Sequence, residues 1–292
     1  MTLLDNDIAD KNTGAAPTVP DRVRAGIGVL TAAPGHAMAW LVIVIVLAWA
    51  LVPSWFTKYS PLEGDSNASF SAPSLEHLFG TDRLGRDLLA RTIYGTSTTL
   101  TATLLAVALG FVIGSTIGLL SGFVGGRFDA VIMRFVDVLL AIPSLLLAMT
   151  VVTALGYGTV NIAVAVGISA VAAFARVMRA EVLKVAGTDY VEAAYGSGAG
   201  FGRVVLRHVL PNSVSAVLSL AALECGTAVL AVAALGFLGY GAPPPDPEWG
   251  LAVSEGRDYL ATYPWISLLP GIVIAVVVLS TNRIGRALGE KR

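Results

Sequence analysis

Few residues in this chain of 292 are of the types that do chemistry, and their spacing does not assemble an active site. The three histidines lie far apart in the sequence, and no His-x-x-x-His or Cys-x-x-Cys spacing occurs that would predict a metal site. The single cysteine, Cys225, excludes an intrachain disulfide and a thiolate metal cluster. No Gly-Lys-Ser/Thr phosphate loop is present, so ATP cannot bind through a Walker A motif. We therefore expect no catalytic residue, and no metal or cofactor bound by this chain.

The segment 187–211 carries the clearest pattern of small and polar residues. Asp189, followed three positions later by Glu192, predicts the start of a short helix in which the Asp side chain accepts a backbone hydrogen bond near Glu192. Ala193 and Ala194 favour helix, and four glycines at alternate positions are expected to end it. Such a helix suits insertion into a groove on a partner protein, although a plain surface helix fits the pattern equally well.

A second short helix is predicted over 203–210, still within this polar segment. It is amphipathic, with Arg203 and Arg207 on one face, and we expect it to end before Pro211 because proline cannot continue a helix.

The composition shows what surrounds these residues. Hydrophobic residues make up 55% of the chain, charged residues 13%, and the mean hydropathy is +0.75. A soluble globular protein has about 25% charged residues, so a soluble fold is excluded. The formal net charge of −1, without a basic tract, gives no sign of nucleic-acid binding. The sequence therefore predicts a protein embedded in a lipid bilayer.

Six stretches are long and apolar enough to cross a bilayer core about 30 Å thick. They are approximately 37–56, 98–122, 131–155, 159–177, 213–239 and 265–282. The first follows a polar tail and is too long for a cleavable signal peptide. Because lipid tolerates no unpaired backbone and no alternating strand pattern occurs, we predict an all-α integral membrane protein with six transmembrane helices.

The predicted organisation has four parts. Residues 1–36 form an N-terminal tail, 37–95 the first transmembrane helix and an outer loop, 96–287 a five-helix domain containing the inner loop 178–212, and 288–292 the C-terminal end. With the N-terminus cytoplasmic, most of the 19 Lys and Arg residues lie in inner segments; the outer ones are Lys58, Arg83, Arg86, Arg91 and Arg257. This bias predicts that both termini are cytoplasmic.

Glycines recur at every fourth position of the second stretch and are expected to form a stripe along which another helix packs closely. The stripe consists of Gly110, Gly114, Gly118 and Gly122, and it would continue to Gly126. A packing face is a better explanation of this register than a solute path.

Two acidic residues lie within apolar stretches. Glu224 is about midway along 213–239; it could line a translocation cavity, or it could hydrogen-bond a neighbouring helix while protonated. Asp137 follows Arg134 by three residues on the same helix face, and we expect the two to pair near the inner membrane surface. Pro143 is expected to bend this third stretch.

The outer segment 77–87 combines opposite charges with two glycines. We expect an internally salt-bridged turn with Gly80 and Gly85 as hinges, in a structural role rather than in contact with substrate. The charged residues concerned are Asp82, Arg83, Arg86 and Asp87.

Several of these motifs resemble a known family. Glu192-Ala193-Ala194, then Gly198, then Leu210-Pro211 resembles the EAA motif of ABC importer permeases. The outer segments 77–87 and 236–250 resemble the peptide branch of that family. The resemblance extends over about 37–290. It indicates the second permease subunit of a dipeptide, oligopeptide or nickel importer, with a type I importer transmembrane fold.

The resemblance implies a set of partners and a role for the inner loop. Residues 189–198 would form the coupling helix that docks on a cytoplasmic ATPase, and ATP and Mg would be bound by the ATPase subunits. The expected partners are a second permease, forming a heterodimer, two ATPase domains and an extracytoplasmic solute-binding protein. The location would be the bacterial cell membrane. The chain would not itself be an enzyme. Nickel or glutathione as cargo, and a stand-alone transporter driven by an ion gradient, remain alternatives.

Overall fold

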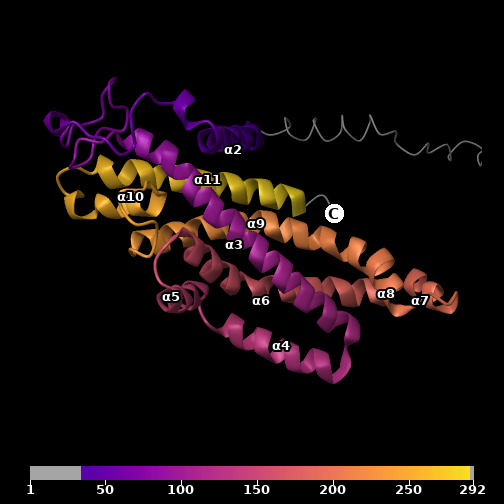
Figure 1. The fold of residues 1–292 in the computed structure, drawn as a ribbon. Helices are drawn as coiled ribbons and strands as arrows, with labels where there is room; N and C mark the ends of the chain where they lie inside the picture. The colour runs from indigo at the N-terminus through magenta and orange to yellow at the C-terminus, as the bar shows by residue number, and fades with distance from the viewer. Residues whose placement is uncertain (1–33, 290–292) are drawn as a thin grey trace, which may run out of the picture.

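A computed structural model describes residues 34–289, whose helices form an elongated bundle (Figure 1). The helices are α2 (Pro34–Leu51), α3 (Leu88–Val124), α4 (Gly126–Ala141), α5 (Ser144–Leu155), α6 (Thr159–Ala186), α7 (Asp189–Gly196), α8 (Phe201–Val204), α9 (Leu210–Phe237), α10 (Trp249–Glu255) and α11 (Trp265–Gly289). Within the described residues there is no β-strand, so the all-α prediction is confirmed. Most of the predicted N-terminal tail lies outside the described residues.

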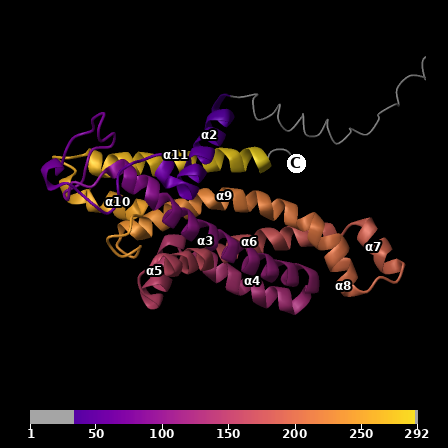
Figure 2. The same cartoon turned by 45° about the horizontal axis from the view of Figure 1, so that its top comes forward.

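The two ends of the bundle differ in character. Figures 1 and 2 both place the segments 52–87 and 238–264, including α10, at one end, which we call the loop end. Helices α7 and α8 lie at the opposite end, which we call the α7 end, and the last turns of α11 point in the same direction.

A helix occupies each of the six stretches predicted to cross the membrane. Four helices are long and apolar enough to span it: α3, α6, the continuous helix Phe201–Phe237, and α11. The pair α4–α5 could form a fifth span, and α2 is apolar but shorter. The count of six is therefore approximate, since two of the predicted spans are a short helix and a bent pair.

The third predicted stretch, 131–155, is not one helix. It breaks between α4 and α5, whose axes differ by 95°. Ile142 has extended backbone angles (φ −90°, ψ 128°), because the residue before a proline is disfavoured in the helical region. Pro143 was expected to bend the span, and the structure shows that it ends one helix before another begins in a new direction.

The glycines of α3 bring this helix close to α6. A Cβ atom built on Gly114 would lie 2.5 Å from the carbonyl oxygen of Val171 and 2.6 Å from the Cβ of Phe174. Cβ atoms would also lie 3.0 Å or less from α6 at Gly110, Gly118 and Gly122. In lipid, where helices associate mainly through packing, glycine at these positions permits backbone-to-backbone contact.

The stripe ends at Gly122. Gly126 begins α4 after a turn at Gly125, has a φ of +59°, and has no other atom within 4 Å of the position of its missing Cβ. The prediction that included Gly126 in the stripe is therefore wrong, because the chain has left the axis of α3 at that point.

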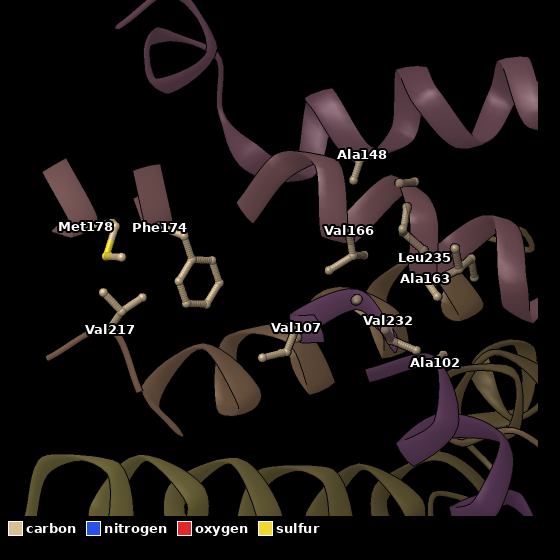
Figure 3. Packing of buried hydrophobic residues seen from close by; sticks show 14 of the residues in the cluster. Ala102, Val107, Ala148, Ala163, Val166, Phe174, Met178, Val217, Val232 and Leu235 are labelled. Carbon is tan, nitrogen blue, oxygen red and sulfur yellow. The ribbon is translucent and has the colours of Figure 1, made fainter. Parts of the chain in front are cut away.

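Small side chains fill the core between α3, α5, α6 and α9 (Figure 3). Alanine and valine dominate it, and Phe174 and Met178 of α6 are its largest members. With few bulky residues to separate them, the four helices lie close together, which fixes the positions of the polar residues described below.

The charged segment 77–87 folds as predicted and also reaches beyond itself. The Arg86 Nε lies 2.6 Å from Asp82 Oδ2, and both side chains are almost fully buried. Gly80 and Gly85 have φ values of +73° and +74°, as hinges of such a turn require. The internally salt-bridged turn is thus confirmed.

Arginines of this region also connect the segment 52–87 and the start of α3 to α10. Arg91, 1% exposed, donates to Glu255 Oε2 at 3.0 Å and to the carbonyl oxygen of Pro61 at 3.0 Å. The carboxylate of Glu255 also accepts from Arg86 at 3.4 Å. The Glu255 side chain is 24% exposed, but Arg91 is buried, so loss of this carboxylate would leave a buried guanidinium without its nearest charge partner. This cluster therefore holds the loop end in a fixed shape.

Candidate functional site

Helix α7 is a short helix at one end of the bundle, anchored on one side only. Val191 is 1% exposed and belongs to the hydrophobic core, and Ala194 packs against the same core. Glu192 and Ala193 are exposed. The helix therefore presents the glutamate and one small side chain outward, while its opposite face packs against the hydrophobic core.

Aromatic side chains of α7 and of the start of α8 are also exposed. Tyr190 is 45% exposed, Tyr195 44%, and Phe201 of α8 55%. Large exposed aromatic groups on a surface that no other described element covers are typical of a protein-binding surface.

The start of α7 differs from the sequence prediction. Asp189 is the first residue of the helix and not its cap; Thr188 is the cap, and no side chain makes a capping hydrogen bond. The Thr188 hydroxyl instead donates to the carbonyl oxygen of Val185 at 2.5 Å. The negative charges of Asp189 and Glu192 in the first turn still favour the helix through its dipole.

The end of α7 depends on Gly198. The backbone N–H of Ala199 donates to the carbonyl oxygen of Ala194 at 3.1 Å, and that of Gly198 to the carbonyl oxygen of Tyr195 at 2.9 Å. This pair of bonds is the Schellman motif, which requires a left-handed residue directly after the helix cap. Gly198 has a φ of +84°, so it supplies the conformation that ends α7.

The predicted helix 203–210 that ends before Pro211 is wrong. Helix α8 continues through a π-helical turn, Val205–Val209, into α9, and the whole stretch is one continuous helix. The wider turn is closed by a bond from Leu210 N to Val205 O, and it accommodates Pro211 in the first turn of α9. Helix α8, which follows α7 after a short turn, is therefore continuous with a membrane span.

Glu224 lies beside a small cavity in the middle of the bundle. The cavity has a volume of about 160 Å³ and is bounded by α3, α6, α9 and the break between α4 and α5. Its polar lining consists of Glu224, Thr227, Ser144 and Ser169, and the rest is small and apolar. Among the described residues Glu224 forms no ion pair. The structure thus places a carboxyl group at a partly polar cavity that several spans share.

Asp137 does not pair with Arg134. Its carboxylate accepts from Arg176 of α6 at 2.5 Å, with both side chains more than half exposed. A second pair, Arg179 with Asp129 at 2.5 Å, joins the same two helices. The expected pair within α4 is wrong because α6 lies alongside α4 and presents two arginines one turn apart.

Glu248, in the Pro-rich segment before α10, has a structural role that sequence reasoning missed. The side chain is 3% exposed, and its carboxylate accepts from the backbone N–H groups of Gly250 and Leu251, both at 2.8 Å. The hydroxyl of Thr99 on α3 also donates to it, at 3.3 Å, and a Cβ on Gly236 of α9 would overlap it. Burial raises the pKa of Glu248, although these hydrogen bonds oppose the shift.

The carboxylate of Glu248 therefore caps α10 and joins it to two membrane helices. Glutamate is not among the favoured capping residues, so the sequence carried no clear signal for this role. Within residues 34–289 no group of three or more His, Cys, Asp or Glu side chains could hold a metal ion.

The chain is similar to a known protein family and to several transport permeases. Residues 114–292 match the family described as binding-protein-dependent transport system inner membrane component. The chain is 38% identical over 258 residues to the dipeptide transport system permease protein DppC of Alkalihalophilus pseudofirmus, covering 87% of this chain and 85% of that protein. It is 39% identical to the di/tripeptide transport system permease protein DppC of Pseudomonas aeruginosa, with coverages of 86% and 84%.

A glutathione transport permease and a solved transporter structure are also similar to this chain. The glutathione transport system permease protein GsiD of Escherichia coli is 38% identical, with coverages of 86% and 84%. Among solved structures, a chain of the MetNI methionine ABC transporter in an inward-facing conformation has a TM-score of 0.54 and 22% identity. That match covers 69% of this chain and 96% of the other, and it concerns the fold alone.

Proposed function

Since the chain belongs to the family of binding-protein-dependent transport system inner membrane components, we propose that it is a membrane-spanning permease subunit of an ATP-driven peptide importer. The observation that carries this proposal is α7: an exposed, one-sided helix joined by the short turn 197–200 to α8, which is continuous through a π turn with the membrane span α9. The relatives named above support di- or oligopeptides as the cargo class.

In this proposal α7 is the coupling helix and ATP is hydrolysed elsewhere. Glu192 and Ala193 face an ATPase subunit, Ala194 seats the helix on the bundle, and Gly198 ends it. ATP and Mg bind to two such cytoplasmic ATPase domains. Leu210 and Pro211 lie in the first turn of α9, which continues α8, so a displacement of α7 would reach this span through the short turn 197–200 and α8.

The cavity beside Glu224 supports a translocation path near the middle of the bundle. Its volume of about 160 Å³ is below the range of about 300–1,000 Å³ that small-molecule sites occupy, so a peptide needs the helices to move apart. A second permease, packed beside this chain as a heterodimer, would form the other wall. In the open path the carboxyl group of Glu224 would meet the amino terminus of the peptide.

The orientation follows from the same assignment. The α7 end faces the cytoplasm, together with both chain termini, in the bacterial cell membrane. The loop end faces outward, where the segments 52–87 and 238–264 would receive an extracytoplasmic solute-binding protein. The ion pairs of Arg86 and Arg91 with Glu255 would keep that docking surface rigid.

The test is ATP-dependent peptide uptake into proteoliposomes that contain this chain with its partner permease, its ATPases and its binding protein. Ala193→Arg should abolish uptake, because a long charged side chain at this exposed position leaves the fold intact but blocks close approach of an ATPase. Ala193→Ser is the matched control and should retain uptake. Both variants should reach the membrane in normal amounts.

Two outcomes contradict the proposal. Uptake by Ala193→Arg at the wild-type rate would show that α7 does not dock on the ATPase. Uptake by the purified chain alone, driven by an ion gradient, would instead favour a stand-alone secondary transporter.

A further inference from the structure

A groove between the first and last helices of the described chain has no role in the proposed transport cycle. It lies between the N-terminal part of α2 and the C-terminal half of α11, and its volume is about 620 Å³. This volume falls within the range of about 300–1,000 Å³ typical of small-molecule sites. Its walls are mainly apolar and open to the side of the bundle: Met38 is 68% exposed and Leu279 66%.

One end of the groove is positively charged. His36, Arg283 and Arg286 line it there, and Arg283 and Arg286 are exposed. Among the described residues neither arginine has an acidic partner within ion-pair distance. A Cβ on Gly35 would overlap the guanidinium group of Arg283, so glycine at this position allows that group to lie against the first turn of α2.

We propose that this groove binds one anionic glycerophospholipid, with the phosphate at Arg283 and Arg286 and an acyl chain between α2 and α11. Charge complementarity identifies the occupant. Two guanidinium groups are suited to a phosphate, because each offers parallel N–H donors to its oxygens. The apolar walls, including Val42 and Val276, continue from the charged end along the helices, as a lipid tail requires.

The position of the groove is consistent with such a lipid. Arg283 and Arg286 lie on the last turns of α11, which point toward the α7 end (Figure 1). Basic pockets between membrane helices on the cytoplasmic side bind anionic lipid head groups. Assignment to the cytoplasmic leaflet relies on the orientation proposed above, whereas lipid binding itself does not.

The experiment measures lipid binding to the purified complex of this chain with its partner subunits, by native mass spectrometry in a neutral detergent. Phosphatidylglycerol and phosphatidylcholine with identical acyl chains are titrated in parallel. Each arginine near a lipid phosphate contributes roughly fivefold to affinity, so the double variant Arg283→Gln/Arg286→Gln should bind phosphatidylglycerol about thirtyfold more weakly than wild type.

The matched control is Arg127→Gln, which removes an exposed arginine near the α7 end of the bundle but outside the groove. It should bind phosphatidylglycerol like the wild-type chain. Wild type and control should prefer phosphatidylglycerol to phosphatidylcholine, and the double variant should bind the two lipids alike. Heat stability in detergent without added lipid should be equal for all three proteins, because none of the three arginines forms an ion pair within residues 34–289.

Four results would overturn the proposal. The first is that wild type binds the two lipids equally, and the second is that Arg127→Gln loses as much affinity as the double variant. The third is that phosphatidylglycerol binds only after residues 1–33 are deleted, which would mean that this segment occupies the groove. The fourth is that phosphatidylglycerol binds the isolated chain but not the complex, which would mean that another subunit covers the groove.

Discussion

The packing of α3 against α6 can be tested by a single methyl group. Gly114→Ala places a Cβ 2.5 Å from the carbonyl oxygen of Val171 and 2.6 Å from the Cβ of Phe174. Carbon atoms in favourable contact lie about 3.5–4.0 Å apart, so the two helices must separate by roughly 1 Å. The oxygen belongs to the backbone of α6 and cannot rotate away, which makes local relief difficult.

A second glycine serves as a control that isolates the energetic cost of overpacking at Gly114. Overpacking a well-packed site by a methyl group costs about 1–3 kcal/mol, whereas replacing a helical glycine by alanine favours the helix by about 1 kcal/mol. Gly271 in α11 is also helical, but no other atom lies within 4 Å of its missing Cβ. Because the helix preference is the same in both, Gly114→Ala should be less stable than Gly271→Ala by about 1–3 kcal/mol.

The assay is the fraction of detergent-purified protein that stays monodisperse after heating, measured for both variants and for wild type. The midpoint should be lower for Gly114→Ala than for Gly271→Ala by roughly 2–4 °C for each kcal/mol of difference. Gly114→Leu should prevent assembly of the complex, and Gly271→Leu should not.

The reasoning would be refuted by equal midpoints for the two alanine variants. That result would mean that α3 and α6 are separated at Gly114 by enough space for a methyl group. Reduced uptake by Gly114→Ala is expected only in proportion to the amount of assembled protein, because Gly114 does not line the cavity beside Glu224.

Four further predictions concern the two ends and the centre of the bundle. Gly198→Ala puts a side chain at a φ of +84°, at a cost of about 1–2 kcal/mol, so ATP-driven uptake should fall, while Gly200→Ala, at a φ of −72°, should leave uptake unchanged. Glu248→Ala should lower the stability of the folded chain by about 1–3 kcal/mol, because two backbone N–H groups lose their acceptor. Because burial raises the pKa of Glu248, its contribution to stability is greatest below the ordinary glutamate pKa of about 4.3 and is lost as pH rises through the raised pKa. Between acid and neutral pH, the melting temperature should therefore fall less for Glu248→Gln, which does not titrate, than for wild type. Glu224→Gln should weaken peptide uptake and alter its pH dependence, and an unchanged rate and pH profile would exclude this residue from the translocation path.

Some features of the fold could be read from short stretches of sequence. The apolar stretches were found because roughly 20 consecutive apolar residues are needed to cross the bilayer as a helix. The left-handed turn after α7 was signalled by Gly198, and the bend after α4 by Pro143, because both residues restrict or extend the backbone locally. Neither signal contained the 95° angle between α4 and α5, which depends on how α5 packs against α6.

Other features were misjudged because a local rule competed with tertiary contacts. Pro211 was expected to end a helix, but a π turn just before it lets the helix continue into α9. The spacing of Arg134 and Asp137 suits a pair within one helix, yet Arg176 on a neighbouring helix takes the carboxylate. The π turn is a backbone adjustment that a proline in the sequence does not predict. The partner of Asp137 is decided by the packing of α6 against α4, which the spacing within α4 does not contain.

By itself, the sequence determined that this protein is a helical membrane protein, which stretches form its helices, and where the short helix α7 begins and ends within a residue or two. These properties follow from apolar length and from the backbone preferences of glycine and proline, which act over a few residues. Only the tertiary structure decided which charged groups meet and that Glu248 joins three helices. Those properties depend on distances between segments far apart in the chain, and no local pattern of residues specifies such distances.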